Sequence, residues 1–344
     1  MLFASLVLWS HCFHLGGFGF DPITRLTREA EDTGRLAVDA FFLLSGFLIA
    51  RSLETTGNPW RYLWHRVLRI FPGYWVCLIV VAFGFAPLLY VHERGTLAGF
   101  LAAQPSAGEY VRTNAFLVLN QSSIAGLLPQ SQLGINQSLW TLQYEFICYL
   151  ALAVLGTIAL RRRAPGIFLA PLLICLMLFA ATVFVRGMHT PTTSARVLEF
   201  FTFFALGTCA YLFRDRIPMR SGIAWVCATL FAATLATPLY GIVMPLTLSY
   251  ALLYAAVRLP LRNFDRRADL SYGVYIYAFV IQQTLTAFGA AALGFLGYFF
   301  TALAISMAFA AASWFAIEKR CLALKNLTIE APWRRRAGQT TALG

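Results

Sequence analysis

The sequence predicts an all-α polytopic membrane protein with about ten transmembrane helices. Hydrophobic residues make up 59% of its 344 residues and charged residues only 12%, whereas a soluble domain carries about 25% charged residues. The apolar residues gather in segments near the roughly 20 residues that cross a bilayer as a helix. Alternating segments of about 10 residues, which mark an outer-membrane barrel, are absent. These observations exclude a soluble enzyme, a disordered protein and a disulfide-rich secreted module.

The apolar stretches form one predicted transmembrane domain, residues 1–317. In chain order they cover residues 1–13, 36–50, 71–91, 138–160, 167–185, 197–213, 222–237, 240–257, 270–288 and 294–317. Only Pro238 and Leu239 separate the seventh from the eighth. Residues 318–344 are predicted to be a basic cytoplasmic tail. The sequence contains no internal repeat and no separate soluble domain.

The first stretch is short for a membrane span. Its thirteen residues reach only about 20 Å as a helix, against a hydrocarbon core of about 30 Å. No basic segment precedes it and no small-residue cleavage site follows, so it does not resemble a signal peptide. We therefore expect Met1 to lie inside a first helix that is truncated at its start.

Basic residues orient the predicted helices. With the first helix starting inside, the outer loops hold seven of the 27 Lys and Arg residues and the inner loops and tail hold the other 20. The seven are Arg25, Arg28, Arg35, Arg94, Arg112, Arg186 and Arg196. Cytoplasmic loops of bacterial membrane proteins carry this excess. The pattern predicts a multi-pass protein of the bacterial inner membrane with both termini in the cytoplasm. The net charge of +12 is spread over short loops, which argues against a nucleic-acid partner.

Familiar soluble-enzyme motifs are missing. The seven cysteines form no CxxC pair and no cluster with histidine, so they offer no metal site. The sequence also lacks a GxGxxG string, a Walker sequence, HExxH and GxSxG. We expect no permanently bound cofactor.

Few ionisable side chains lie at membrane depth, where they tend to mark function. His11 in the first span can accept a proton from a hydroxyl and return it, as acyl transfer to an alcohol requires. The alternative is a histidine hydrogen-bonded to a neighbouring helix. Glu145 begins the fourth span, where it either orients a histidine or bonds to Trp140, Tyr144 or Tyr149.

Two acidic residues have a simpler interpretation. Asp39 is expected to pair with Arg35 one turn away or to cap a helix, and Glu199 is given the same structural interpretation.

Arg66 and Arg69 lie three residues apart on the inner side and so share one face of a helix, which Pro72 should end or kink. Two adjacent guanidiniums suit a phosphate or pyrophosphate. A topology anchor is the alternative.

Five strings together resemble the acyltransferase 3 family, integral-membrane O-acyltransferases that modify bacterial surface glycans. They are residues 9–13 (WSHCF), 38–49 (VDAFFLLSGFLI), 66–72 (RVLRIFP), 138–145 (SLWTLQYE) and 269–277 (DLSYGVYIY). Their order along a ten-helix frame extends the resemblance over nearly the whole chain.

The resemblance implies a donor and residue roles. His11 corresponds to the family's essential histidine, Arg66 and Arg69 to its R-x-x-R pair, and Glu145 to its fourth-helix acid. The donor implied is an acyl-CoA, most simply acetyl-CoA, whose phosphates the arginine pair would hold. The sequence departs from the pattern twice: the family's arginine eleven positions before the histidine would precede Met1, and Ala278 stands where a late histidine is frequent.

We expect an O-acetyltransferase that acts on a sugar hydroxyl of a lipid-linked or exported polysaccharide. His11 and Glu145 are the expected catalytic residues, with His11 acting as general base or as a covalent acyl carrier. Residues expected to line a pocket or to pack helices are Asp39, Ser45, Trp140, Ser271, Tyr272 and Tyr275. The alternative function is a transporter or flippase of a lipid-linked or acidic sugar, which would use the same basic loops.

Overall fold

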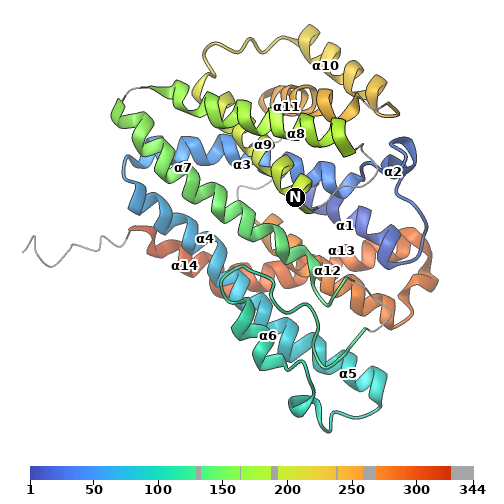
Figure 1. Cartoon of the computed structure of the whole chain (residues 1–344). Coiled ribbons are helices and arrows are strands. Elements are labelled where there is room, and N and C mark those ends of the chain that lie inside the picture. The colour runs from blue at the N-terminus through green and yellow to red at the C-terminus, as the bar shows by residue number, and fades with distance from the viewer. Residues whose placement is uncertain (129–132, 163, 187–192, 238, 259–268, 327–344) are drawn as a thin grey trace, which may run out of the picture.

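The computed structural model describes residues 1–128, 133–162, 164–186, 193–237, 239–258 and 269–326, and these residues form helices and loops without a β-strand (Figure 1). The long helices are α1 (Leu2–Leu15), α3 (Thr33–Thr56), α4 (Pro59–Val80), α7 (Leu142–Arg162), α8 (Leu169–Arg186), α9 (Thr193–Leu212), α10 (Ser221–Thr234), α11 (Tyr240–Arg258), α12 (Ser271–Ala287) and α13 (Gly294–Ser313). The shorter ones are α2 (Pro22–Leu26), α5 (Ala86–Arg94), α6 (Ala107–Asn114) and α14 (Lys319–Ala323). The all-helical prediction is confirmed.

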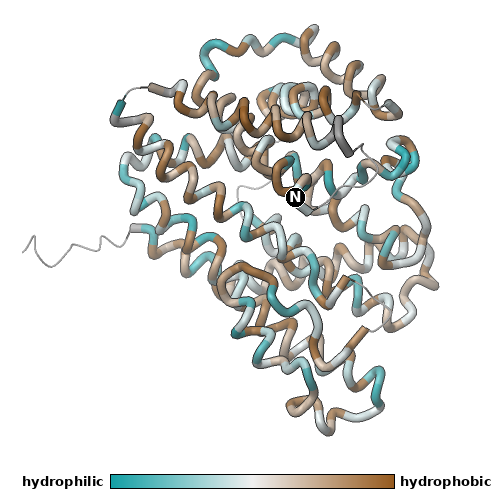
Figure 2. The backbone as a smooth tube through the Cα atoms, in the orientation of Figure 1, coloured by the Kyte–Doolittle hydropathy of each residue, from teal (hydrophilic) through white to brown (hydrophobic). Residues whose placement is uncertain are grey.

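Each of the ten predicted stretches falls on a helix, and six helical segments are long and apolar enough to cross a membrane. These six are Thr33–Thr56, Pro59–Arg94, Gln137–Ala159, Thr193–Leu212, Tyr240–Arg258 and Ala290–Ala323. The first, fifth and seventh stretches form shorter apolar helices. Figure 2 shows hydrophobic residues along the helices and hydrophilic ones gathered near their ends, as a multi-pass membrane protein requires. The predicted tail from residue 327 onward lies outside the described residues.

The third predicted stretch begins earlier in the structure than in the sequence analysis. Asn58 caps α4 by accepting hydrogen bonds from the backbone N–H groups of Trp60 and Arg61, and Pro59 occupies the first turn, where its missing N–H costs nothing. Of the two effects expected of Pro72, a helix end or a kink, the helix end is wrong, because α4 continues to Val80. A π-helical turn over Val81–Phe85 then precedes Pro87 and joins α4 to α5.

Helices α3 and α9 cross at a pair of glycines. A Cβ atom on Gly46 would lie 2.1 Å from the carbonyl oxygen of Phe204, and one on Gly207 would lie 1.9 Å from that of Leu43. Only glycine allows the two backbones to approach this closely. The hydroxyl of Thr208 donates to the Gly46 carbonyl at 3.4 Å, which fixes the crossing. This contact holds α3 closely against α9.

The two ends of α3 lie on opposite sides of the molecule. Figure 1 shows its C-terminal end near the start of α4, the end of α7 and helix α14, whereas α2 lies at the other side. On that other side Asp32 caps α3 by accepting a hydrogen bond from the N–H of Arg35. Helix α1 lies against both α3 and α12, and Gln282 of α12 donates to the Leu8 carbonyl at 2.9 Å.

We predict that Gly207→Ala destabilises the protein by about 1–3 kcal/mol, because the added methyl group overlaps the α3 backbone. The measurement is thermal unfolding of the detergent-purified protein, followed by intrinsic fluorescence. Gly222→Ala is the matched control, since it also lies in a helix and its Cβ would meet nothing within 4 Å. Equal unfolding temperatures for the two variants would contradict the role given to the crossing.

Candidate active site

His11 lies on α1 with one ring nitrogen free to act. Its Nδ1 atom is buried and has no hydrogen-bond partner among the described residues. The ring packs edge-on against Phe279 of α12, with 5.2 Å between ring centroids. A neutral imidazole in this setting can accept a proton from a hydroxyl group.

Asp32 is the acidic residue beside His11, and the sequence analysis did not assign it a role. Its Oδ1 atom accepts a hydrogen bond from Ser10 at 3.0 Å, and its negative charge acts on the His11 ring. The sequence signal that could have indicated Asp32 is its position just before α3, where an aspartate is typical of an N-cap. The loop that contains Asp32 is thus tied to the helix that carries His11.

Glu145 lies on α7 and contacts Ser45 of α3. The Glu145 carboxylate accepts a short hydrogen bond from Tyr149 and a second, at 3.5 Å, from Ser45. Among the described residues, Glu145 therefore hydrogen-bonds to Tyr149 and not to His11. Tyr149 was one of the structural partners expected from the sequence. Arg66 and Arg69 are the cations whose charges act on it. The structure groups Glu145 and Ser45 with the arginine end of the site.

Asp39 forms no direct ion pair with Arg35 in the described part of the chain, although the charges of the two side chains interact. Asp39 sits within α3, so it is no cap, and neither of its oxygens accepts a hydrogen bond from the described residues. Arg35 instead contacts Glu31 at 3.0 Å and Glu199 at 3.5 Å. Each of the three guanidinium nitrogens thus has a contact, because Nη1 also donates to the carbonyl of Ala30.

Arg66 and Arg69 differ in their surroundings although they share a helix face. Arg69 forms ion pairs with Asp269 and with Glu318, the second at 3.5 Å. Its guanidinium also lies over the rings of Tyr272 and Trp314, at 5.4 and 5.8 Å from their centroids. The positive charge of Arg69 is therefore already balanced within the protein.

Arg66 keeps its charge available. Its nearest polar partner is the hydroxyl of Ser52 on α3, at 3.4 Å, and its Nε atom has no partner in the described part of the chain. The guanidinium lies 5.9 Å from the ring centroid of Tyr62. No carboxylate of the described residues forms an ion pair with it, which leaves it free to bind an anion.

Lys325 adds a cation to this region that the sequence analysis missed. The segment just after α14 is tied to α4, because the indole N–H of Trp64 donates to the Leu324 carbonyl at 3.4 Å. Burial lowers the pKa of Lys325, and the nearby charges of Arg66 and Arg69 lower it further. No sequence spacing relates Lys325 to Arg66, since the fold brings them together.

The remaining predicted residues have structural contacts. Ser271 donates to Asp269 at 2.6 Å, and Tyr272 donates to the Ile70 carbonyl at 2.7 Å. Tyr275 shares a 2.6 Å hydrogen bond with the hydroxyl of Thr141. Trp140 packs against aromatic rings of α7 and α9.

The comparisons with known proteins decide the family. Residues 1–313 match the family whose description is "Acyltransferase domain". This chain belongs to that acyltransferase family.

Two relatives align with the acyltransferase over nearly its whole length. One is "Nodulation protein 10" of Rhizobium leguminosarum bv. viciae, 27% identical over an alignment of 354 positions, gaps included, that covers 94% of this chain and 92% of the relative. The other is the "O-acetyl transferase" of Shigella phage Sf6, 27% identical over 332 residues that cover 93% of each protein. No solved structure matches the chain. The family resemblance drawn from five short strings is confirmed, and an enzyme is favoured over a transporter.

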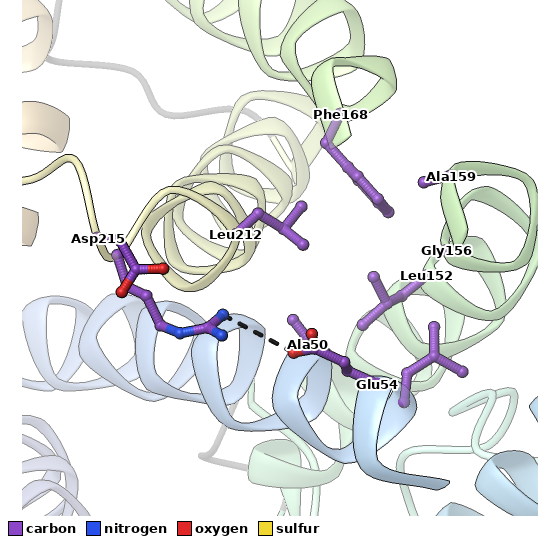
Figure 3. Close-up of a pocket in the computed structure, with 10 residues that line it drawn as sticks. Ala50, Glu54, Leu152, Gly156, Ala159, Phe168, Leu212 and Asp215 are labelled. Atoms are coloured by element: carbon purple, nitrogen blue, oxygen red, sulfur yellow. Dashed lines mark ion pairs between the residues drawn. The ribbon is translucent and has the colours of Figure 1, made fainter. Parts of the chain in front are cut away.

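A separate cavity of about 310 Å³ lies between the ends of α3, α7 and α9 (Figure 3). Its wall is largely apolar, with Leu152, Phe168 and Leu212 facing the interior. An ion pair of 3.7 Å between Glu54 and Arg214 stands at its charged side. None of the predicted site residues lines this cavity.

Substitution of Arg69 should affect stability, whereas substitution of Arg66 should affect donor binding. Arg69→Gln should lower stability by about 3 kcal/mol, because it leaves the buried Glu318 without its cation. Arg66→Gln should leave the unfolding temperature nearly unchanged and raise the KM for the donor. Thermal unfolding and steady-state kinetics of the two variants measure this difference. Equal loss of stability in both would contradict the assignment of Arg66 as the free cation.

Proposed function

We propose that this acyltransferase is an O-acetyltransferase of the bacterial inner membrane. It moves an acetyl group from cytosolic acetyl-CoA to a sugar hydroxyl of a lipid-linked or exported polysaccharide, with ten transmembrane helices and both termini in the cytoplasm. The family assignment and the relative named O-acetyl transferase support the reaction class. The observation that carries the proposal is the free Nδ1 atom of His11 at one end of α3, with the free cation Arg66 at the other.

Helix α3 relates these two positions. Asp32 at its start lies beside His11, Ser45 contacts Glu145, and Ser52 contacts Arg66. Twenty residues separate Asp32 from Ser52, which corresponds to about 30 Å of helix. The donor would enter at the Arg66 end, and its acyl arm would extend along α3 past Ser45 and Glu145.

At the Arg66 end, Arg66 and Lys325 would bind the donor phosphates. Both are basic, and neither has a carboxylate partner in the described part of the chain. Arg69 would hold α4 against α12 and the π-helical turn Trp314–Glu318, and so keep Arg66 in place. In this proposal Arg69 is a positioning residue.

At the other end, His11 would act on the acceptor. The imidazole takes the proton of the sugar hydroxyl as its oxygen attacks the thioester carbon. The carbon–sulfur bond breaks, and the proton passes to the CoA sulfur. A covalent route through acetyl-His11 is the alternative, and mass spectrometry of the enzyme after donor alone distinguishes the two.

The proposed reaction predicts a mass difference in the surface glycan. Cells that carry the gene should show an increment of one acetyl group that a deletion strain lacks. Mass spectrometry of the purified glycans measures it. A glycan of unchanged mass that is exported in a different amount would instead indicate a transporter.

His11→Ala should reduce acetyl transfer by about 100-fold or more, because general base catalysis contributes at least this factor. Transfer of labelled acetyl to the glycan in membranes gives the rate, at equal protein levels. His14→Ala is the matched control, since His14 is exposed on the same helix. Full activity in His11→Ala would refute the proposed base.

Donor binding should weaken at alkaline pH. The lowered pKa of Lys325 means that it loses its positive charge at a lower pH than an ordinary lysine. The KM for acetyl-CoA should therefore rise with pH across the alkaline range. Lys325→Arg, which stays charged, should flatten this rise. A pH profile identical in both proteins would exclude Lys325 from the donor site.

A further inference from the structure

Three buried carboxylates meet where α3 and α9 begin. Glu31 precedes α3, Asp39 lies on α3 and Glu199 lies on α9, and their side chains each present an oxygen within 4.8 Å of the others. Their residues are only 2%, 1% and 4% exposed, respectively. Burying three negative charges together is costly unless they are neutralised by a proton or a cation.

The arginines of this region neutralise only part of the charge. Arg35 contacts Glu31 and Glu199, and Arg196 interacts electrostatically with the same two acids and with Asp32. Four carboxylates, counting Asp32 and Asp39, face these two guanidiniums. The group carries two negative charges in excess when all its members are ionised, which matches one divalent cation.

Two polar groups at this place lack partners. Both oxygens of Asp39 are buried and accept no hydrogen bond from the described residues. The hydroxyl of Tyr240 on α11 is also buried without a partner in that part of the chain, and it interacts electrostatically with Glu31, Glu199 and Asp39. Among the described residues, the cluster of carboxylates therefore includes one unpartnered side chain, Asp39 of α3, and has a second beside it, Tyr240 of α11.

We propose that Glu31, Asp39 and Glu199 form a binding site for a hard divalent cation, Ca²⁺ or Mg²⁺. Carboxylate oxygens are the ligands that these ions prefer, and no soft sulfur or imidazole ligand is part of the cluster. Asp39 supplies the ligand oxygens that the protein itself leaves unbonded. The Tyr240 hydroxyl, which lacks a partner among the described residues, would donate to a water bound to the ion.

The cation would link three parts of the structure. It would join the loop before α3 to α3 and α9, close to the Gly46–Gly207 crossing. Since Asp32 adjoins Glu31 and accepts a hydrogen bond from Ser10, the ion would also fix the loop beside His11. The inference stands on this cluster alone and does not depend on the proposed function.

The test is cation binding to the full chain in detergent after removal of divalent ions with EDTA. CaCl₂ and MgCl₂ are titrated separately, and the unfolding temperature and the heat of binding are measured. The wild type should show a saturable rise in unfolding temperature with at least one of the two ions. Asp39→Asn should bind that ion at least about tenfold more weakly, because it loses the unpaired ligand charge.

Glu109→Gln is the matched control. Glu109 is an exposed acid on α6 that pairs with Arg112 at 3.6 Å, so its amide variant should bind the cation as the wild type does. If Asp39→Asn does not fold, Glu199→Gln provides the same comparison. The proposal is overturned if the wild type binds neither ion, or if the cluster variants bind as tightly as the wild type.

Discussion

The close approach of α3 and α9 is the constraint on which the rest of the structure depends. Gly46 and Gly207 bring the two backbones together where any larger residue would overlap a carbonyl group. Near the crossing, the rings of Phe42 and Phe200 stack with 4.6 Å between centroids. Helix α3 is thereby held so that His11, Glu145 and Arg66 lie beside successive parts of its length. A small displacement of α3 would move all three positions relative to one another.

Charge balance separates structural from available side chains along this helix. Arg35 and Arg69 each contact two acids, so each fixes neighbouring segments while its own charge is neutralised. Arg66 and Asp39 are the opposite case, since each lacks a charged hydrogen-bond partner in the described part of the chain. An unpaired ionisable group at membrane depth, such as Asp39, is costly and tends to mark a functional site. The proposed donor site and the proposed cation site both follow from this distinction.

Hydropathy alone predicted the helices well, because a membrane demands an apolar segment wherever the chain crosses it. All ten predicted stretches are helical. The error at Pro72 arose because a local rule treats proline as a helix end, whereas a helix buried among others tolerates it. The family strings indicated His11, Arg66 and Glu145 as candidate site residues, but the partners of these residues depend on long-range contacts. Arg69 looked equivalent to Arg66 because its two acidic partners lie 200 and 249 residues away in the sequence. The proximity of Lys325 to Arg66 and the cluster of Glu31, Asp39 and Glu199 could not be predicted for the same reason, because these residues are far apart in the sequence.

The central claim is that the donor binds at the Arg66 end of α3 and that the acceptor reacts at the His11 end. The most direct measurement compares acetyl transfer in inverted and right-side-out membrane vesicles that contain the enzyme and its glycan acceptor. Labelled acetyl-CoA is supplied only from the outside of each vesicle. We expect transfer in inverted vesicles, which present the cytoplasmic face and Arg66 to the donor, and none in sealed right-side-out vesicles. Transfer confined to right-side-out vesicles would contradict it.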